Sequence, residues 1–335
     1  MGSKIVYADL SLKSFTLEDA TRIKNDALPT ISKLLSNLSL RDHSQRSVTV
    51  SVQLNELAYD KDIFKQAKAT RLGDGKYLIE IGVGLLGQLS LIARSIAADK
   101  NVLRGRTKSV LLDAAIRKNG REKALGNFIF HYMLTFVMWH EVAHIALGHL
   151  DWLEKNAQLC AIEEFGSNQI PESEFIRYQT MEGDADRQAS LWTAAVTDYS
   201  ISSNPFLRYP VLADVFFDIG YIYGALFVFL DSVDADIPPS RRKHPKADVR
   251  LGIALSFVEQ YLFQYHKDSH SALMQQVYSG GIRAISTILH AEKRSFDVGG
   301  VAKFMAENGH RIDTMRLRSL QHSVTKSSSG SFSVT

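Results

Sequence analysis

Residues 127–153 of this chain read NFIFHYMLTFVMWHEVAHIALGHLDWL and contain the pattern HExxH at His140, Glu141 and His144. The stretch has no proline and is rich in Phe, Leu, Met, Val and Ala, which predicts a helix over about residues 126–150. A helix that is apolar on nearly every side is a buried one. Two histidines and a glutamate buried on such a helix are costly unless they gain partners.

The spacing of the motif indicates what those partners are. Positions four apart on a helix lie one above the other, so His140 and His144 can bind one Zn²⁺ through neutral imidazoles. Glu141 is then placed to reach a water molecule on that metal. The motif therefore predicts a zinc hydrolase, although HExxH is short enough to arise by chance and needs support from the rest of the chain.

Two further histidines belong to the same predicted helix. His149 is nine positions from His140 and so points to the opposite side of the helix, which means that the two cannot share a metal. His131 falls on that far side as well. We interpret both as hydrogen-bonded packing histidines. The metzincin pattern HExxHxxGxxH is not met, because positions 147 and 150 are both leucine.

The best candidate for a third ligand lies in residues 181–192, which read MEGDADRQASLW. On a second helix Glu182 and Asp186 would share a face, which allows one carboxylate to bind zinc and the other to hold a ligand histidine by its free ring N–H. The alternative is an acidic face exposed to solvent.

In these elements the chain resembles the gluzincin peptidases, in which HExxH is followed some tens of residues later by ExxxD or ExxAD. Glu182, Ala185 and Asp186 match the ExxAD form of the CAAX prenyl protease and heat-shock protease family. The resemblance implies that Glu182 completes the zinc site with His140 and His144. It also implies that Asp186 orients a ligand imidazole.

A third element of the same family, HPxxxxR, is matched by His244, Pro245 and Arg250. Locally, the pattern predicts that Pro245 is the first residue of a helix with His244 at its cap. A cationic side chain facing the site could stabilise the oxyanion of a tetrahedral intermediate. Arg250 or His244 is the candidate for that role, and the alternative for Arg250 is a simple ion pair with a carboxylate.

The chain as a whole predicts a mostly helical α+β fold with a zincin-like core, a small N-terminal sheet and the central buried HExxH helix. A helix is expected over residues 17–38, strands from Ser47 and from Lys76, and mostly helix from Leu85 onward. The expected organisation is an N-terminal helix, small sheet and connecting helices over residues 1–125, a helical metallopeptidase core over 126–322, and a disordered tail over 323–335.

Composition narrows the function classes. With 335 residues and 45% hydrophobic content the chain can bury a large core, and its one cysteine, Cys160, excludes a disulfide framework and favours a cytoplasmic location. The net charge is only +3. A basic run from Arg104 to Lys123 lacks interleaved aromatic residues, so a solvated face is favoured over nucleic-acid binding.

One segment, residues 211–233, is apolar enough toward its end to be tested as a possible membrane span. It contains Asp214, Asp218 and Asp231. Its uninterrupted apolar part is about a dozen residues, short of the ~20 needed to cross a bilayer. We therefore expect a buried core helix here and no membrane span.

Together these patterns predict a Zn²⁺-dependent endopeptidase that cleaves an intracellular protein by metal-activated water, with a protein or peptide substrate. The chain also resembles, in its metal motif and size, the phage-exclusion (Lit-type) peptidases and the metallopeptidases that cleave repressors. Two alternatives stay open: a regulatory or binding protein with a structural His/Glu cluster, and a metallohydrolase acting on something other than peptides. Glu141 argues against the first, because a structural site needs no base.

Overall fold

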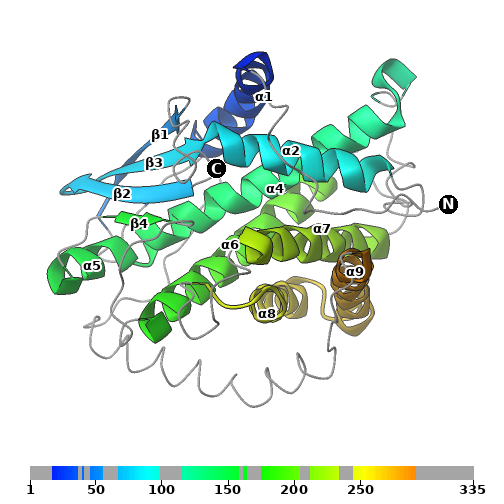
Figure 1. Cartoon of the computed structure of the whole chain (residues 1–335). Helices are drawn as coiled ribbons and strands as arrows, with labels where there is room; N and C mark the ends of the chain where they lie inside the picture. Colours follow the sequence, from blue (N-terminus) through cyan, green and yellow to red (C-terminus); the bar gives the residue numbers. More distant parts are fainter. Residues whose placement is uncertain are drawn as a thin grey trace.

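The computed structural model describes residues 17–36, 46–55, 67–98, 117–157, 161–163, 175–203, 212–233 and 244–291, together with Leu40 and Ala115. The described part is mostly helical with a small sheet, as predicted (Figure 1). Its helices are α1 (Leu17–Ser36), α2 (Val83–Ala98), α4 (Arg121–Ala146), α5 (His149–Ala157), α6 (Phe175–Ser203), α7 (Leu212–Val233), α8 (Ala247–Tyr265) and α9 (His270–Ala291). The expected tail, Cys160 and the start of the basic run lie outside the described residues.

The sheet has the strand order β1-β3-β2-β4, with β1 (Thr49–Asn55) parallel to β3 (Lys76–Gly82). Strand β2 (Ala67–Gly73) runs antiparallel to β3 on its other side, and β4 (Ala161–Glu163) pairs antiparallel with β2. Strands β1 and β3 were predicted from their alternating apolar residues. Strand β2 was missed because its buried positions are only small alanines, and β4 because three residues carry no periodicity.

Helix α4 is the central element of the fold. It packs against α1, α2, α6 and α7, and also against β2 and β3 (Figure 1). Its side chains are buried on all sides along most of its length, as the apolar sequence predicted. The polar residues of the HExxH motif therefore lie inside the protein, within the last two turns of this helix.

The predicted helix over residues 126–150 is in fact two helices. Helix α4 ends at Ala146, and Gly148 takes a left-handed backbone conformation, with φ of 75°, that glycine adopts without a Cβ clash. Its N–H donates to the carbonyl of Ile145 at 3.1 Å, in the pattern that closes many helices. The chain turns there, and α5 begins at the next residue, His149.

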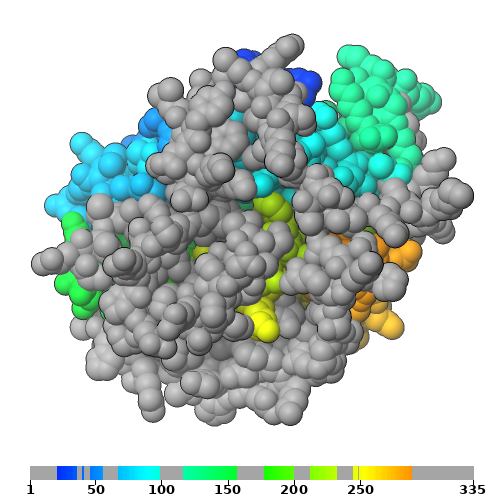
Figure 2. Space-filling model, viewed as in Figure 1, coloured from blue at the N-terminus to red at the C-terminus, as the bar shows by residue number. Residues whose placement is uncertain are grey.

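Helix α7 packs chiefly against α9, and both lie on the side of α4 away from the sheet (Figure 1). Among the described residues Leu212–Asp231 is the segment long and apolar enough to cross a membrane, but 78% of its apolar stretch is buried in the protein interior. This agrees with the prediction of a core helix. In the space-filling view α7 lies between the sheet at the left and α9, in orange, at the right (Figure 2).

Helix α1 covers Leu17–Ser36 of the helix predicted over residues 17–38, and residues 37 and 38 lie outside the described residues. One boundary differs slightly from expectation. Helix α8 begins at Ala247 with Lys246 at its cap, so Pro245 precedes the helix instead of opening it. The first backbone hydrogen bond there, from Arg250 N–H to the Lys246 carbonyl at 2.9 Å, explains the later start.

Candidate metal centre

Three helices bring the predicted site residues together. Helix α4 contributes the HExxH residues and α6 the ExxAD carboxylates, while the HPxxxxR residues lie at the start of α8, which packs on α6. All of these polar side chains are buried, with exposed fractions of 5% or less: His140, Glu141, His144, Glu182, Asp186, His244 and Arg250. The second helix predicted around residues 181–192 is confirmed as the middle of α6.

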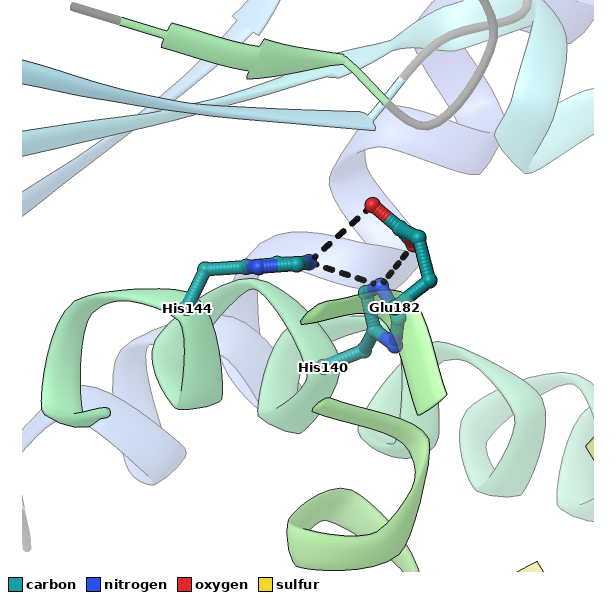
Figure 3. A group of neighbouring side chains, drawn as sticks. All are labelled: His140, His144 and Glu182. Atoms are coloured by element: carbon teal, nitrogen blue, oxygen red, sulfur yellow. Dashed lines mark hydrogen bonds and ion pairs between the residues drawn. The ribbon is translucent and has the colours of Figure 1, made fainter. Parts of the chain in front are cut away.

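His140, His144 and Glu182 point toward one another (Figure 3). His140 Nε2 lies 3.1 Å from Glu182 Oε2 and 3.1 Å from His144 Nε2. His144 Nε2 lies 3.6 Å from Glu182 Oε1. With metal–ligand distances of about 2.0–2.2 Å, the edges of a tetrahedral zinc site are about 3.3–3.6 Å long. The three side chains are therefore spaced as ligands of one ion would be.

The second ring nitrogen of His140 faces Asp186. Its Nδ1 lies 3.0 Å from Asp186 Oδ1, at ion-pair distance. With its proton on Nδ1, a neutral His140 presents the Nε2 lone pair to Glu182 and His144. Asp186 lies beside His140 and outside the group of residues that could hold a metal.

Glu182 is an anion in this cluster. Burial alone would raise its pKa, but the positive charges of protonated His244 and His144 hold the pKa of Glu182 well below its ordinary value. When the histidines are neutral, a carboxylate and imidazole lone pairs that converge in a buried space repel one another unless a cation lies between them. The donor set of two nitrogens and one oxygen suits a metal such as zinc, so the residues present fit the expected group.

Arg250 forms an ion pair with Asp186. Its Nε and Nη2 donate to the two Asp186 oxygens at 2.7 and 2.8 Å, and its guanidinium lies 5.1 Å from the ring centre of Phe227. This is the ion pair considered as the alternative from the sequence. Arg250 and His140 thus both lie against the Asp186 carboxylate.

His244 is the residue of the HPxxxxR element that reaches the centre itself. Its Nδ1 lies 3.1 Å from Glu182 Oε2, the same oxygen that faces His140. His244 and Arg250 therefore approach the two α6 carboxylates separately, one on Glu182 and the other on Asp186.

His149 contradicts the geometry expected from the sequence. Its Nδ1 lies 2.8 Å from His144 Nδ1, although an unbroken helix would have carried it to the far side. The turn at Gly148 places His149 beside the site. A glycine directly after the HExxH motif is typical of a helix end, so the sequence contained an indication of this turn. Burial lowers the pKa of His149 to about 4, so the ring is neutral. The group of residues that could share a metal still excludes His149 within the described part of the chain.

His131 behaves as expected for a packing histidine. Its Nδ1 lies 2.9 Å from the Thr30 hydroxyl, at the contact between α4 and α1. The interpretation of His131 as a hydrogen-bonded packing residue is confirmed. It also provides a natural comparison for the histidines of the site, since it lies on the same helix as His140 and His144.

The fold and site together define a mostly helical α+β protein with a buried centre of two histidines and one glutamate that could hold a metal ion. The chain matches the peptidase U49 family over residues 99–270, just over half of its length, and so belongs to that family. No curated protein and no solved structure matches it significantly. Family membership supports a peptidase, which acts on a protein or peptide substrate.

Proposed function

We propose that this protein is a zinc-dependent endopeptidase of the gluzincin type. The observation that carries the proposal is the convergence of His140, His144 and Glu182 in a chain of a peptidase family. The proposed substrate is an intracellular protein that is cleaved in the cytoplasm. A chain with one cysteine forms no internal disulfide and fits this reducing compartment.

His140 and His144 would hold the ion through their Nε2 atoms and Glu182 through its carboxylate. When bound, zinc would polarise the scissile carbonyl and lower the pKa of a bound water. Glu141, which follows His140 directly in α4, accepts the proton of the attacking water and passes it to the leaving amine.

Of the two candidates for the oxyanion role, His244 is the better placed. It contacts the ligand carboxylate Glu182, whereas Arg250 is held by both oxygens of Asp186. We therefore assign His244 to the developing oxyanion and Arg250 to positioning, through Asp186, of the His140 ring.

The substrate is proposed to bind as an extended strand at the sheet. Strand β4 ends the order of the described strands, and its neighbour β2 packs on α4, which carries the HExxH motif. An extended peptide can add to such an edge through main-chain hydrogen bonds. This mode of binding would bring the scissile bond alongside the helix that carries Glu141.

The test is Glu141→Gln in the full chain. The amide keeps the size of the side chain but cannot accept the water's proton, so cleavage should fall by about 10²–10⁴-fold while metal content is unchanged. Metal is measured by elemental analysis, and cleavage by new protein termini in cells expressing each form. Glu122→Gln, an exposed site in the first turn of the same helix, is the matched control and should stay active.

Other outcomes separate the alternatives. If the purified protein binds no metal, or if Glu182→Ala binds as much as the wild type, the zinc site is wrong. If metal binds but expression of the active chain yields no new termini, the protein is a metal-supported binding module or a hydrolase of other substrates. Full activity of the Glu141→Gln form would remove Glu141 from the mechanism.

A further inference from the structure

We propose that His149 is a positioning residue for the metal centre: its Nδ1 accepts the Nδ1–H of His144 and so keeps the His144 Nε2 lone pair directed at the metal position. The inference rests on the proposed function and extends it to a residue outside the three motifs. It concerns His144 specifically, because the Nδ1 of His140 faces a different group, the Asp186 carboxylate.

The contact itself limits where the protons can be. The two Nδ1 atoms are 2.8 Å apart, so one of them carries a hydrogen and the other accepts it. If His144 carries it, His144 Nε2 is free to bind a metal. If His149 carries it, the proton of a neutral His144 is on Nε2, directed at His140 and Glu182, and a metal cannot bind there. The state of His149 therefore selects the tautomer of the ligand.

The fold holds His149 firmly in this position. It is the first residue of α5, and its ring is buried and lies edge-on to His144, with ring centres 5.0 Å apart. Two residues further on, the buried Asp151 lies 2.8 Å from Arg71 Nε in an ion pair and accepts a hydrogen bond from the Tyr77 hydroxyl at 3.2 Å. Because Arg71 is in β2 and Tyr77 in β3, the start of α5 is anchored to the sheet.

The two histidines thus face neighbours of different kinds. His140 Nδ1 lies 3.0 Å from Asp186, a carboxylate in an ion pair with Arg250, while His144 Nδ1 contacts an imidazole ring. The carboxylates of the centre are then Glu182, which belongs to the group that could hold a metal, and the buried Glu141, the proposed base. A neutral acceptor orients His144 without adding a further anion to the buried cluster.

The experiment measures zinc affinity of the purified full chain by competition with a chelator. His149→Phe keeps the ring size but removes the acceptor, and should weaken zinc binding by about 10–100-fold. His149→Asn returns an acceptor oxygen near the Nδ1 position and should recover most of that loss. His131→Phe removes a histidine of α4 that bonds Thr30 and should leave the affinity unchanged.

A merely structural role would not distinguish the Phe and Asn variants in zinc affinity, so equal weakening in both would overturn the inference. So would His149→Phe binding as tightly as the wild type. If His149→Phe does not fold, the nitrogen-15 spectrum of the zinc-loaded wild-type histidines decides: the hydrogen is expected on Nδ1 of His144, and finding it on Nδ1 of His149 overturns the inference. A wild type that binds no zinc overturns the proposed function as well, whereas an unchanged His149→Phe affinity overturns only the role of His149.

Discussion

The contact of α4 and α8 with α6 and the contact of α7 with α9 are both buried, but they are built in opposite ways. The first encloses charge: Glu182, Asp186 and Arg250 are each 2% exposed or less and are held by ion pairs. The second is built around glycines: Gly220 and Gly224 of α7 lie against the backbone of Gly281 in α9. Gly280 of α9 lies against the backbone of Phe217 and Tyr221 in α7. There the backbones of the two helices touch.

The difference shows which kind of change each region tolerates. At the charged contact a side chain can be replaced without a steric clash, but a lost partner leaves a buried charge uncompensated. At the glycine contact even one methyl group has no space. The stability of the site helices therefore depends on keeping their charged partners. The stability of the α7–α9 pair depends on adding no side-chain volume.

The largest effect on stability is expected from Gly220→Ala. The added methyl would overlap the backbone carbonyl of Val277, and a helix backbone cannot yield as a flexible side chain can. We expect a loss of more than about 3 kcal/mol in the free energy of unfolding, measured by urea denaturation. Gly126→Ala in α4 meets only ordinary contacts with Arg94 and should be neutral or slightly stabilising. Similar losses in both variants would remove the distinction between the two contacts.

A smaller loss is expected from Arg250→Leu, because among the described residues the buried Asp186 carboxylate then retains the ion pair with His140 alone. Removing one member of a buried pair costs about 3–5 kcal/mol, here reduced by the remaining histidine. The double variant with Asp186→Leu should recover part of this in urea denaturation, since neither charge remains. A double variant that is less stable than the sum of the single losses would contradict this account of the contact.

Removal of the metal is expected to destabilise the charged contact. If zinc binds only the folded protein, a chelator lowers the midpoint of thermal unfolding, and a hundredfold excess of zinc over its dissociation constant is equivalent to about 2.7 kcal/mol. The shift should vanish in Glu182→Ala. It should persist in Glu122→Gln, which lies on the same helix as the histidine ligands. A chelator that shifts Glu182→Ala as much as the wild type would indicate binding elsewhere.

The smallest effect on stability is expected at His131, which belongs to neither of the two contacts compared above. Burial lowers its pKa from 6.5, although Asp26 opposes the shift. The unfolded state therefore binds its proton first as pH falls, so stability is lost from about pH 6.5 downward to the lower pKa of the folded protein. His131→Asn should make the unfolding free energy less dependent on pH in that window. An unchanged slope would show that His131 does not contribute.

Much of the site could be predicted because its spacing is helical. His140 with His144, and Glu182 with Asp186, are pairs four residues apart, and that spacing places both members on one face of a helix whatever surrounds it. The partner of Arg250 could not be predicted in the same way, since Asp186 and Arg250 are on different helices and their contact depends on how α6 and α8 pack. The same holds for β2 and β4, which are strands because of their neighbours and not because of their own residues.

The wrong prediction for His149, that it points away from His140, has a different origin. It depends on one backbone angle, the φ of Gly148. Gly148 ends α4, and had the helix continued, His149 would lie on the opposite face. Gly148→Ala would favour that continuation, since alanine extends a helix and resists the left-handed conformation. The neighbour of His144, a proposed metal ligand, thus depends on the backbone conformation of Gly148. Gly148 belongs to none of the three motifs, so the motifs by themselves do not predict this contact.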